Sequence, residues 1–406
     1  MADCSVWRRI TMINEKMINL GSSRSKIRDL FEYGKVLAEK IGKENVFDFT
    51  LGNPSVPCPK EVNECAANLV LNDKSVHAYT SAQGDKRTRA AIKAYNEKKY
   101  GFSLDDELIY MTCGAAAALR ITLGALISSP DDEVIVFAPF FPEYKVFIEG
   151  AGGKMTMIKA DVAKFGLNLE GLKTALNKNV RAVIINSPNN PSGTVYSEED
   201  IKALSAILTE AEKTYGAPIY LITDEPYREI LFDGATCPFV PKYYDDTVVC
   251  YSYSKALSLP GERIGYVAVS PKAAQKDILY YAVCGAGRSL GYVCAPSLYQ
   301  HVLRFCCDKV SDPTPYKDNR DELIRVLTSL NFECVNPKGA FYLFVKSPIP
   351  SATEFSDIAK TYGLLIVPTE TFGVDGYLRL ATCVSKETVI KSEKAFTKLA
   401  KDLKMI

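Results

Sequence analysis

Lys255 stands at a position where a lysine can do chemistry. The apolar run Thr247–Tyr251 is rich in β-branched and aromatic residues and predicts a buried strand. Ser252, Ser254 and Lys255 follow it directly, and Arg263 comes after a Pro-Gly break. Ligands of open α/β sheets bind at the carboxyl ends of strands. A partly desolvated lysine there has a lowered pKa and can act as an amine nucleophile, whereas most loop lysines are simply solvated.

Small and polar residues follow four further predicted strands. Small residues at a strand-to-helix turn let backbone N–H groups approach an anion, helped by the helix N-terminus. Such a turn is predicted at Gly114–Ala116, although these residues alone also fit the start of a plain alanine-rich helix. An acid, a phenol, an amide and an aromatic ring complete the set. After the predicted strands at 108–111, 133–137, 181–186 and 218–223 stand, in turn, Gly114–Ala116, Phe141, Asn190, and Asp224 with Tyr227.

Together these groups are the parts needed to hold pyridoxal 5′-phosphate. An acid keeps the pyridine nitrogen protonated, so that the ring can act as an electron sink. Donors serve the ring oxygen O3′, and a helix N-terminus with a cation holds the phosphate. The lysine forms a Schiff base and then moves the proton. Histidine is not needed, which suits a chain whose only histidines are His77 and His301.

With these motifs in this order, the chain resembles the fold type I, class I/II aminotransferases from about Asp48 to the C-terminus. The resemblance implies an α/β, aspartate aminotransferase-like fold: a mainly parallel, seven-stranded-type sheet covered by helices, and a smaller α+β domain. It implies an enzyme that moves an amino group from an L-amino acid to a 2-oxo acid through a Lys255 Schiff base. The strongest matches are Asn190-Pro191-Ser192-Gly193, Asp224-x-x-Tyr227, and Ser252-x-Ser254-Lys255 with Arg263 eight residues later.

The resemblance also implies a role for each cofactor-binding residue. Lys255 is the catalytic residue, Asp224 pairs with the pyridine nitrogen, and Phe141 stacks on the ring, unless Phe141 is plain core. Asn190 and Tyr227 contact O3′. The phosphate is bound by Ser252, Arg263, the backbone of Gly114, Ala115 and Ala116, and Tyr79 of a neighbouring subunit, although Tyr79 also fits an ordinary interface tyrosine.

Substrate binding is implied for three residues. Arg379 matches the arginine that clamps the substrate α-carboxylate with two hydrogen bonds. An arginine in an apolar strand is costly to bury unpaired, which favours a ligand there. Gly52 matches the glycine that closes over the carboxylate, and Asn190 is the third residue expected to bind the substrate. Arg288 lies near where some family members reach a distal carboxylate across the dimer, but it equally fits a surface arginine.

The sequence departs from the family pattern in the cofactor site. Ala115 and Ala116 stand where a hydroxyl residue is often found. Ser192 replaces the commoner threonine, and the ring stacker is Phe141 rather than tryptophan or tyrosine. None of these changes removes a necessary group.

The elements that position these residues divide the chain into three parts. Strands alternate with helices over 105–270, which predicts a mainly parallel sheet covered on both faces. The pattern changes at Val310–Pro315, and shorter strands, including one at Leu364–Val367, predict a smaller domain. The predicted division is an N-terminal arm (1–20) and helix belonging to the small domain (1–47), a large cofactor-binding domain (48–310) and a C-terminal small domain (311–406).

Composition excludes several classes of partner. The net charge of +1 gives no electrostatic argument for nucleic acid or an anionic membrane. No apolar run approaches the ~20 residues that span a bilayer, and the N-terminus lacks an apolar signal core. Twelve cysteines without CxxC spacing predict reduced thiols and no metal site. We therefore expect a cytoplasmic protein that acts on small molecules. The family resemblance, through the match at Tyr79, implies a homodimer with shared active sites.

Two other functions remain to be weighed. A lyase on the same scaffold would eliminate a β-substituent or decarboxylate its substrate, and the two arginines would fit it equally well. A regulator that keeps the cofactor fold as a sensor would need an added DNA-binding domain. Fewer than 50 residues precede the predicted core, and they are not strongly basic, which disfavours the regulator.

Overall fold

A seven-stranded sheet forms the larger part of the molecule. The computed structural model describes residues 13–22 and 26–406. The strand order is β2-β8-β7-β6-β5-β3-β4, and β8 is antiparallel to both of its neighbours, while the remaining pairs are parallel. The predicted mainly parallel sheet is confirmed. Its strands are β2 (Ile109–Thr112), β3 (Glu133–Phe137), β4 (Lys154–Ile158), β5 (Val180–Asn186), β6 (Tyr220–Asp224), β7 (Thr247–Ser252) and β8 (Gly265–Val269).

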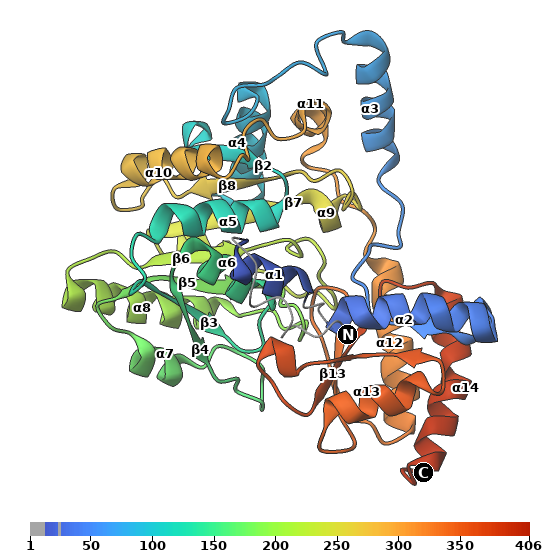
Figure 1. Cartoon of the computed structure of the whole chain (residues 1–406). Helices are drawn as coiled ribbons and strands as arrows, with labels where there is room; N and C mark the ends of the chain where they lie inside the picture. The colour runs from blue at the N-terminus through green and yellow to red at the C-terminus, as the bar shows by residue number, and fades with distance from the viewer. Residues whose placement is uncertain (1–12, 23–25) are drawn as a thin grey trace.

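Helices cover both faces of this sheet because alternate side chains of each strand point to opposite faces. Val248 and Cys250 of β7 join one apolar cluster, whereas Val249 and Tyr251 join another. Helices α5, α6 and α10 cover the first face, and α3, α4, α7, α8 and α11 cover the second (Figure 1). The covering helices are α3 (Lys60–Asn72), α4 (Lys86–Tyr100), α5 (Ala115–Leu126), α6 (Glu143–Ala151), α7 (Leu169–Ala175), α8 (Glu198–Tyr215), α10 (Lys276–Ser289) and α11 (Ser297–Cys306).

Local signals account for the ends of several helices. The Ser197 side chain accepts from the Asp200 amide, and the Asp200 side chain accepts from the Ser197 amide, which together form a capping box. Gly216 ends the same helix in the left-handed conformation, at φ 68°. Asp85 caps α4 by accepting from the Thr88 amide.

A smaller unit carries two further sheets, with the order β12-β13-β10-β9 in one and β1-β11 in the other. Figure 1 shows α12, α13 and α14 gathered around them at lower right, with α2 alongside. The single strand predicted at Leu364–Val367 is wrong, because its two halves belong to different sheets. The elements are α2 (Lys26–Ile41), β1 (Phe47–Asp48), α12 (Thr314–Ser329), β9 (Cys334–Val335), β10 (Tyr342–Lys346), α13 (Ala352–Lys360), β11 (Leu364–Leu365), β12 (Val367–Pro368), β13 (Tyr377–Ala381) and α14 (Lys386–Asp402).

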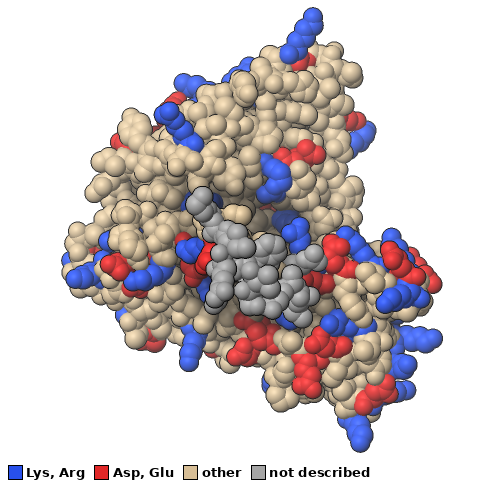
Figure 2. All heavy atoms as spheres, in the orientation of Figure 1, with Lys and Arg blue, Asp and Glu red and all other residues tan. Residues whose placement is uncertain are grey.

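The structure describes only part of the predicted N-terminal arm. Residues 1–12 of that arm lie outside the described residues, and α1 (Glu15–Ser22) forms a short helix. Among the described residues, no helix is both long and apolar enough to cross a bilayer. On the face drawn in Figure 2, acidic and basic side chains are interspersed and are most frequent around the C-terminal elements.

Candidate active site

One cavity, of about 310 Å³, opens where the carboxyl ends of the parallel strands meet the smaller unit. Both units contribute to its wall, as does Ile27 of α2. All the predicted site residues except Gly114 and Tyr79 line it. Those residues are Gly52, Ala115, Ala116, Phe141, Asn190, Asp224, Tyr227, Ser252, Lys255, Arg263 and Arg379.

Lys255 lies in α9 (Tyr253–Ala256), a single helical turn directly after β7. Its place directly after the strand is as the sequence predicted. Lys255 Nζ donates a 2.6 Å hydrogen bond to the Gly52 carbonyl oxygen. The pKa of Lys255 is lowered to about 8, chiefly by burial; Cys383 opposes this shift, and the nearby charges of Arg263 and Arg379 add to it. A neutral amine is therefore accessible near neutral pH.

Asp224 ends strand β6 and is 4% exposed. Its Oδ2 accepts a 2.5 Å hydrogen bond from the Tyr144 hydroxyl, while its buried Oδ1 has no partner among residues 13–22 and 26–406. Burial raises the pKa of Asp224 to about 7, although the Tyr144 hydrogen bond acts in the opposite direction. A buried carboxylate oxygen without a donor is costly. The cavity thus presents an acceptor that suits a protonated nitrogen.

Asn190 contacts Arg379 directly, and Tyr227 contacts Tyr342, whose ring lies against Arg379. Arg379 Nη1 donates to Asn190 Oδ1 over 3.3 Å, and the hydroxyls of Tyr227 and Tyr342 are 3.0 Å apart. The turn that carries Asn190 is fixed by Asn186, whose Oδ1 accepts from the Asn190 amide at 2.7 Å. These contacts bring residues from β13, β10 and the segments after β5 and β6 together.

The Arg379 guanidinium is almost completely buried, at 2% exposure. Its Nη2 donates to the Thr50 carbonyl oxygen, and its Nε has no partner in the part of the chain that the structure describes. No buried carboxylate pairs with it among the described hydrogen bonds and ion pairs. A buried guanidinium with a free donor suits a carboxylate ligand. Gly52 lies nearby, and only glycine fits there, because an added Cβ would be 1.9 Å from Tyr342 Oη.

The N-terminus of α5 and Arg263 form the anion-binding end of the cavity. Gly114 precedes the helix at φ 82°, and an added Cβ there would lie 2.7 Å from Arg263 Nη2. The first-turn N–H groups at Ala115 and Ala116 have no intrahelical partner. Arg263 Nη1 donates to Ser254 Oγ at 3.2 Å, and Ser254 Oγ lies 2.8 Å from Ser252 Oγ.

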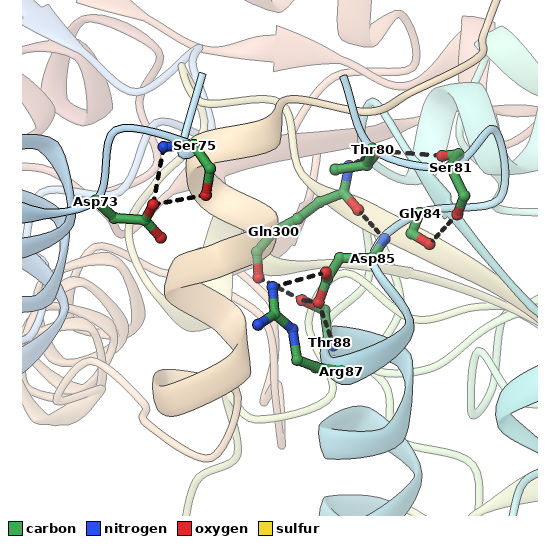
Figure 3. A network of polar contacts seen from close by, with 9 residues as sticks. All are labelled: Asp73, Ser75, Thr80, Ser81, Gly84, Asp85, Arg87, Thr88 and Gln300. Atoms are coloured by element: carbon green, nitrogen blue, oxygen red, sulfur yellow. Dashed lines mark hydrogen bonds and ion pairs between the residues drawn. The ribbon is translucent and has the colours of Figure 1, made fainter. Parts of the chain in front are cut away.

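Tyr79 and Arg288 lie away from this cavity. Tyr79 is 95% exposed, and Arg288 is exposed on α10. The loop that carries Tyr79 is nevertheless firmly held, as Figure 3 shows. The fully buried Gln300 accepts from the Asp85 amide at 2.7 Å and donates to Thr80 Oγ1 at 3.2 Å. The structure thus presents the Tyr79 side chain outward from a fixed loop.

Several residues of the site were not predicted from the sequence. Tyr144 contacts Asp224, Asn186 fixes the turn at Asn190, and Tyr342 and Ile27 line the cavity. Tyr144 and Tyr342 lie in apolar stretches and read as core aromatics. Their hydroxyls are the only local signal, since a buried phenol needs a polar partner.

Comparison with known proteins decides the family. The model for aminotransferase class I and II matches residues 44–392. The chain belongs to this family. A crystal structure of an amino transferase from Eubacterium rectale is 51% identical and superposes with a TM-score of 0.95, covering 97% of this chain and 99% of that one. An aspartate aminotransferase from Thermotoga maritima is 25% identical, with a TM-score of 0.84 and coverage of 97% and 100%. A probable N-acetyl-LL-diaminopimelate aminotransferase from Bacillus subtilis is 29% identical over 92% of this chain and 93% of that one.

The family fixes the class of reaction. This chain is a pyridoxal-phosphate-dependent aminotransferase, which moves an amino group from an amino acid to a 2-oxo acid. The residues of the cavity fit the cofactor. The orphaned Asp224 Oδ1 suits a protonated pyridine nitrogen, and the first turn of α5 beside Arg263 suits a phosphate. The relatives named above are all aminotransferases, and nothing in these comparisons supports the lyase alternative.

Proposed function

We propose that the cavity is the active site and that Lys255 is the residue that binds the cofactor covalently and moves the proton during transamination. When bound, pyridoxal phosphate supplies an electron sink for the substrate Cα. The observation that carries the assignment is that a desolvated lysine and Asp224 line one cavity, with no partner for the buried Asp224 Oδ1 among the described residues. Titratable groups with shifted pKa values cluster at functional sites, and a buried acid and a buried amine that line one cavity are typical of a catalytic site.

The other groups share the work of holding the two molecules. Asp224 stabilises the charged pyridine nitrogen, and Tyr144 holds the carboxylate in place through its 2.5 Å hydrogen bond. Asn190 and Tyr227 serve O3′, and Phe141 covers the ring. The phosphate is bound by Ser252, Arg263 and the backbone of Gly114, Ala115 and Ala116.

Arg379 binds the substrate α-carboxylate. Its unpaired Nε and its buried position support this role, since a planar guanidinium can make two parallel hydrogen bonds to a carboxylate. Gly52 closes over the carboxylate, and Asn190 holds one arm of the guanidinium through the 3.3 Å contact. The clamp fixes the orientation of the substrate, so it acts on the rate as well as on affinity.

A homodimer is the second part of the proposal. Tyr79 is 95% exposed on a loop that Gln300 holds fixed. A large exposed aromatic residue on a fixed loop suits an interface. We assign it to the phosphate site of a second copy. Arg288, also exposed, stays a surface residue in this proposal. We also propose the domain division at residues 47 and 310. A cytoplasmic location completes the proposal, because free thiols are typical of a reducing compartment.

The substrate can be found by a donor screen. The relatives are named for aspartate, diaminopimelate derivatives and aromatic amino acids, so each class is offered with 2-oxoglutarate and glutamate formation is measured. Lys255→Ala serves as the inactive control. Glutamate formed from one donor class supports the proposal. Release of pyruvate or ammonia without an oxo acid, and no glutamate from any donor, would contradict it.

The shared site has its own test. Lys255→Ala and Tyr79→Ala proteins are mixed, unfolded and refolded together. If Tyr79 serves the neighbouring subunit, each hybrid dimer contains one site with both native residues, and activity above that of either parent returns. Hybrids no more active than the parents would place Tyr79 outside the site.

A further inference from the structure

Tyr342 is a buried tyrosine that the proposed roles leave unused. It belongs to β10, is 3% exposed and lines the same cavity as Lys255. Its hydroxyl lies 3.0 Å from the Tyr227 hydroxyl. A Cβ added at Gly52 would lie 1.9 Å from the same oxygen, so the backbone there runs directly against the phenol. Tyr342 thus contacts both the group assigned to O3′ and the segment assigned to the substrate carboxylate.

The ring of Tyr342 also supports Arg379. Antiparallel pairing places Tyr342 opposite Ala381, so Arg379 is its diagonal neighbour on the same face. The guanidinium carbon lies 4.6 Å from the centre of the Tyr342 ring and 5.3 Å from that of Phe372. Cation–π attraction at these distances restricts the orientation of the guanidinium.

We propose that Tyr342 is a positioning residue: its hydroxyl donates to Tyr227 and turns the Tyr227 proton toward O3′, while its ring fixes the Arg379 guanidinium. A phenol has one proton, so a Tyr227 hydroxyl that accepts from Tyr342 keeps its own proton for the cofactor. Burial raises the pKa of both phenols, so both hydroxyls keep their protons near neutral pH. Tyr342, to which no cofactor atom is assigned, is the hydroxyl that is free to donate to the other. The inference rests on the proposed roles of Tyr227 and Arg379.

The test separates the hydroxyl from the ring. Tyr342→Phe keeps the ring but removes the hydroxyl that donates to Tyr227. The hydrogen bond from Tyr227 to O3′ should then weaken, and O3′ should hold more negative charge. That charge favours protonation of the neighbouring Schiff-base nitrogen. The pH at which the visible absorbance of the bound cofactor changes should rise by up to about one unit. The KM for the amino acid should stay nearly unchanged. Tyr342→Leu also removes the ring and should raise KM by about 2- to 30-fold.

Two controls make the result decisive. Tyr244→Phe removes a buried phenol far from the cavity and should leave the absorbance titration unchanged. Tyr227→Phe should shift the titration in the same direction as Tyr342→Phe, and the double variant should shift it no further than Tyr227→Phe alone. If only Tyr227→Phe shifts the titration, the inference about Tyr342 is overturned while the role of Tyr227 stands. If neither shifts it, the proposed role of Tyr227 fails as well.

Discussion

Lys255 Nζ donates a 2.6 Å hydrogen bond to the carbonyl oxygen of Gly52, 203 positions earlier in the chain. Gly52 follows β1, which pairs with β11 of the smaller unit, whereas Lys255 follows β7 of the large sheet. The bond therefore joins the segment that follows β1 to the end of the large sheet at the cavity. It also gives the desolvated Lys255 amine a hydrogen-bond acceptor until a ligand replaces the Gly52 carbonyl as its partner.

Cofactor uptake should depend on pH around the pKa of Lys255. Burial lowers that pKa to about 8, and only the neutral amine attacks an aldehyde. The rate at which cofactor-free protein takes up pyridoxal phosphate should rise about fivefold between pH 7 and pH 8 and level off above about pH 9. Stopped-flow absorbance follows the rate. A rate that climbs steadily to pH 10.5 would indicate a lysine with an ordinary pKa.

Borohydride reduction should fix the cofactor to Lys255. Peptide mass spectrometry then finds the adduct in the segment that contains Lys255, and Lys255→Ala should carry none. The exposed Lys272→Ala is the matched control and should label normally. An adduct on another lysine would contradict the central assignment.

Asp224→Asn should lower turnover by about 10²-fold or more, because the amide cannot supply the charge that holds the pyridine nitrogen protonated. The cofactor should still be fixed to Lys255 by borohydride. Asp246→Asn removes a buried acid outside the cavity and serves as the control for burial alone. Turnover near that of the unaltered enzyme would make Asp224 a structural acid.

The same acid gives the cofactor-free protein a pH-dependent stability. Burial raises the pKa of Asp224 from 3.8 to about 7, so the folded state binds more protons than the unfolded state between these values. The stabilisation of the neutral acid is therefore present at low pH and lost as pH rises toward 7. Asp224→Asn should lose less stability than the unaltered protein between pH 5 and pH 8 in urea titrations. Identical pH profiles would indicate an unshifted acid.

Arg379→Lys should raise KM and lower kcat, because lysine keeps the charge but loses the planar fork. Removing a buried charged pair typically costs ~2–5 kcal/mol, so kcat/KM should fall by about 30-fold to several thousand-fold, and further in Arg379→Ala. The cofactor absorbance should not change. If Arg379→Lys leaves amino-acid kinetics intact, or abolishes cofactor binding, the carboxylate clamp lies elsewhere.

Gly52→Ala should impair the enzyme through contact with Tyr342. The added Cβ would lie 1.9 Å from Tyr342 Oη and 2.8 Å from its Cζ, so the backbone or the ring must move. We expect a higher KM and a lower melting temperature. Gly285→Ala, where nothing lies within 4 Å of the added Cβ, is the control and should stabilise α10 by about 0.5–1 kcal/mol. Addition of Tyr342→Phe to Gly52→Ala should restore part of the loss.

Those residues of the cavity that directly follow a strand could be predicted from the sequence. Asp224, Asn190 and Lys255 lie within a few residues of a predicted strand end, so the shared edge of the sheet is enough to bring them together. The capping box at Ser197 and the glycine at 216 marked α8 in the same local way.

The remaining features depend on contacts between distant segments. Nothing local shows that β8 runs antiparallel to its neighbours or that residues 364–367 divide between two sheets, since pairing partners decide both. Tyr342 reads as a core aromatic in an apolar strand until Tyr227, 115 positions away, supplies its partner. Tyr144 becomes a site residue in the same way only through Asp224.

The division of the cavity wall between two sheets also bears on how such an enzyme can change its preference. The groups assigned to the cofactor lie in the large sheet and its loops, whereas Arg379, Tyr342 and Ile27 belong to the smaller unit and α2. Exchange of the side chain at Ile27 of α2, which is assigned no part in the reaction, can therefore reshape what the enzyme accepts while Lys255 and Asp224 stay in place. A single reactive centre can in this way be inherited intact while its selectivity drifts.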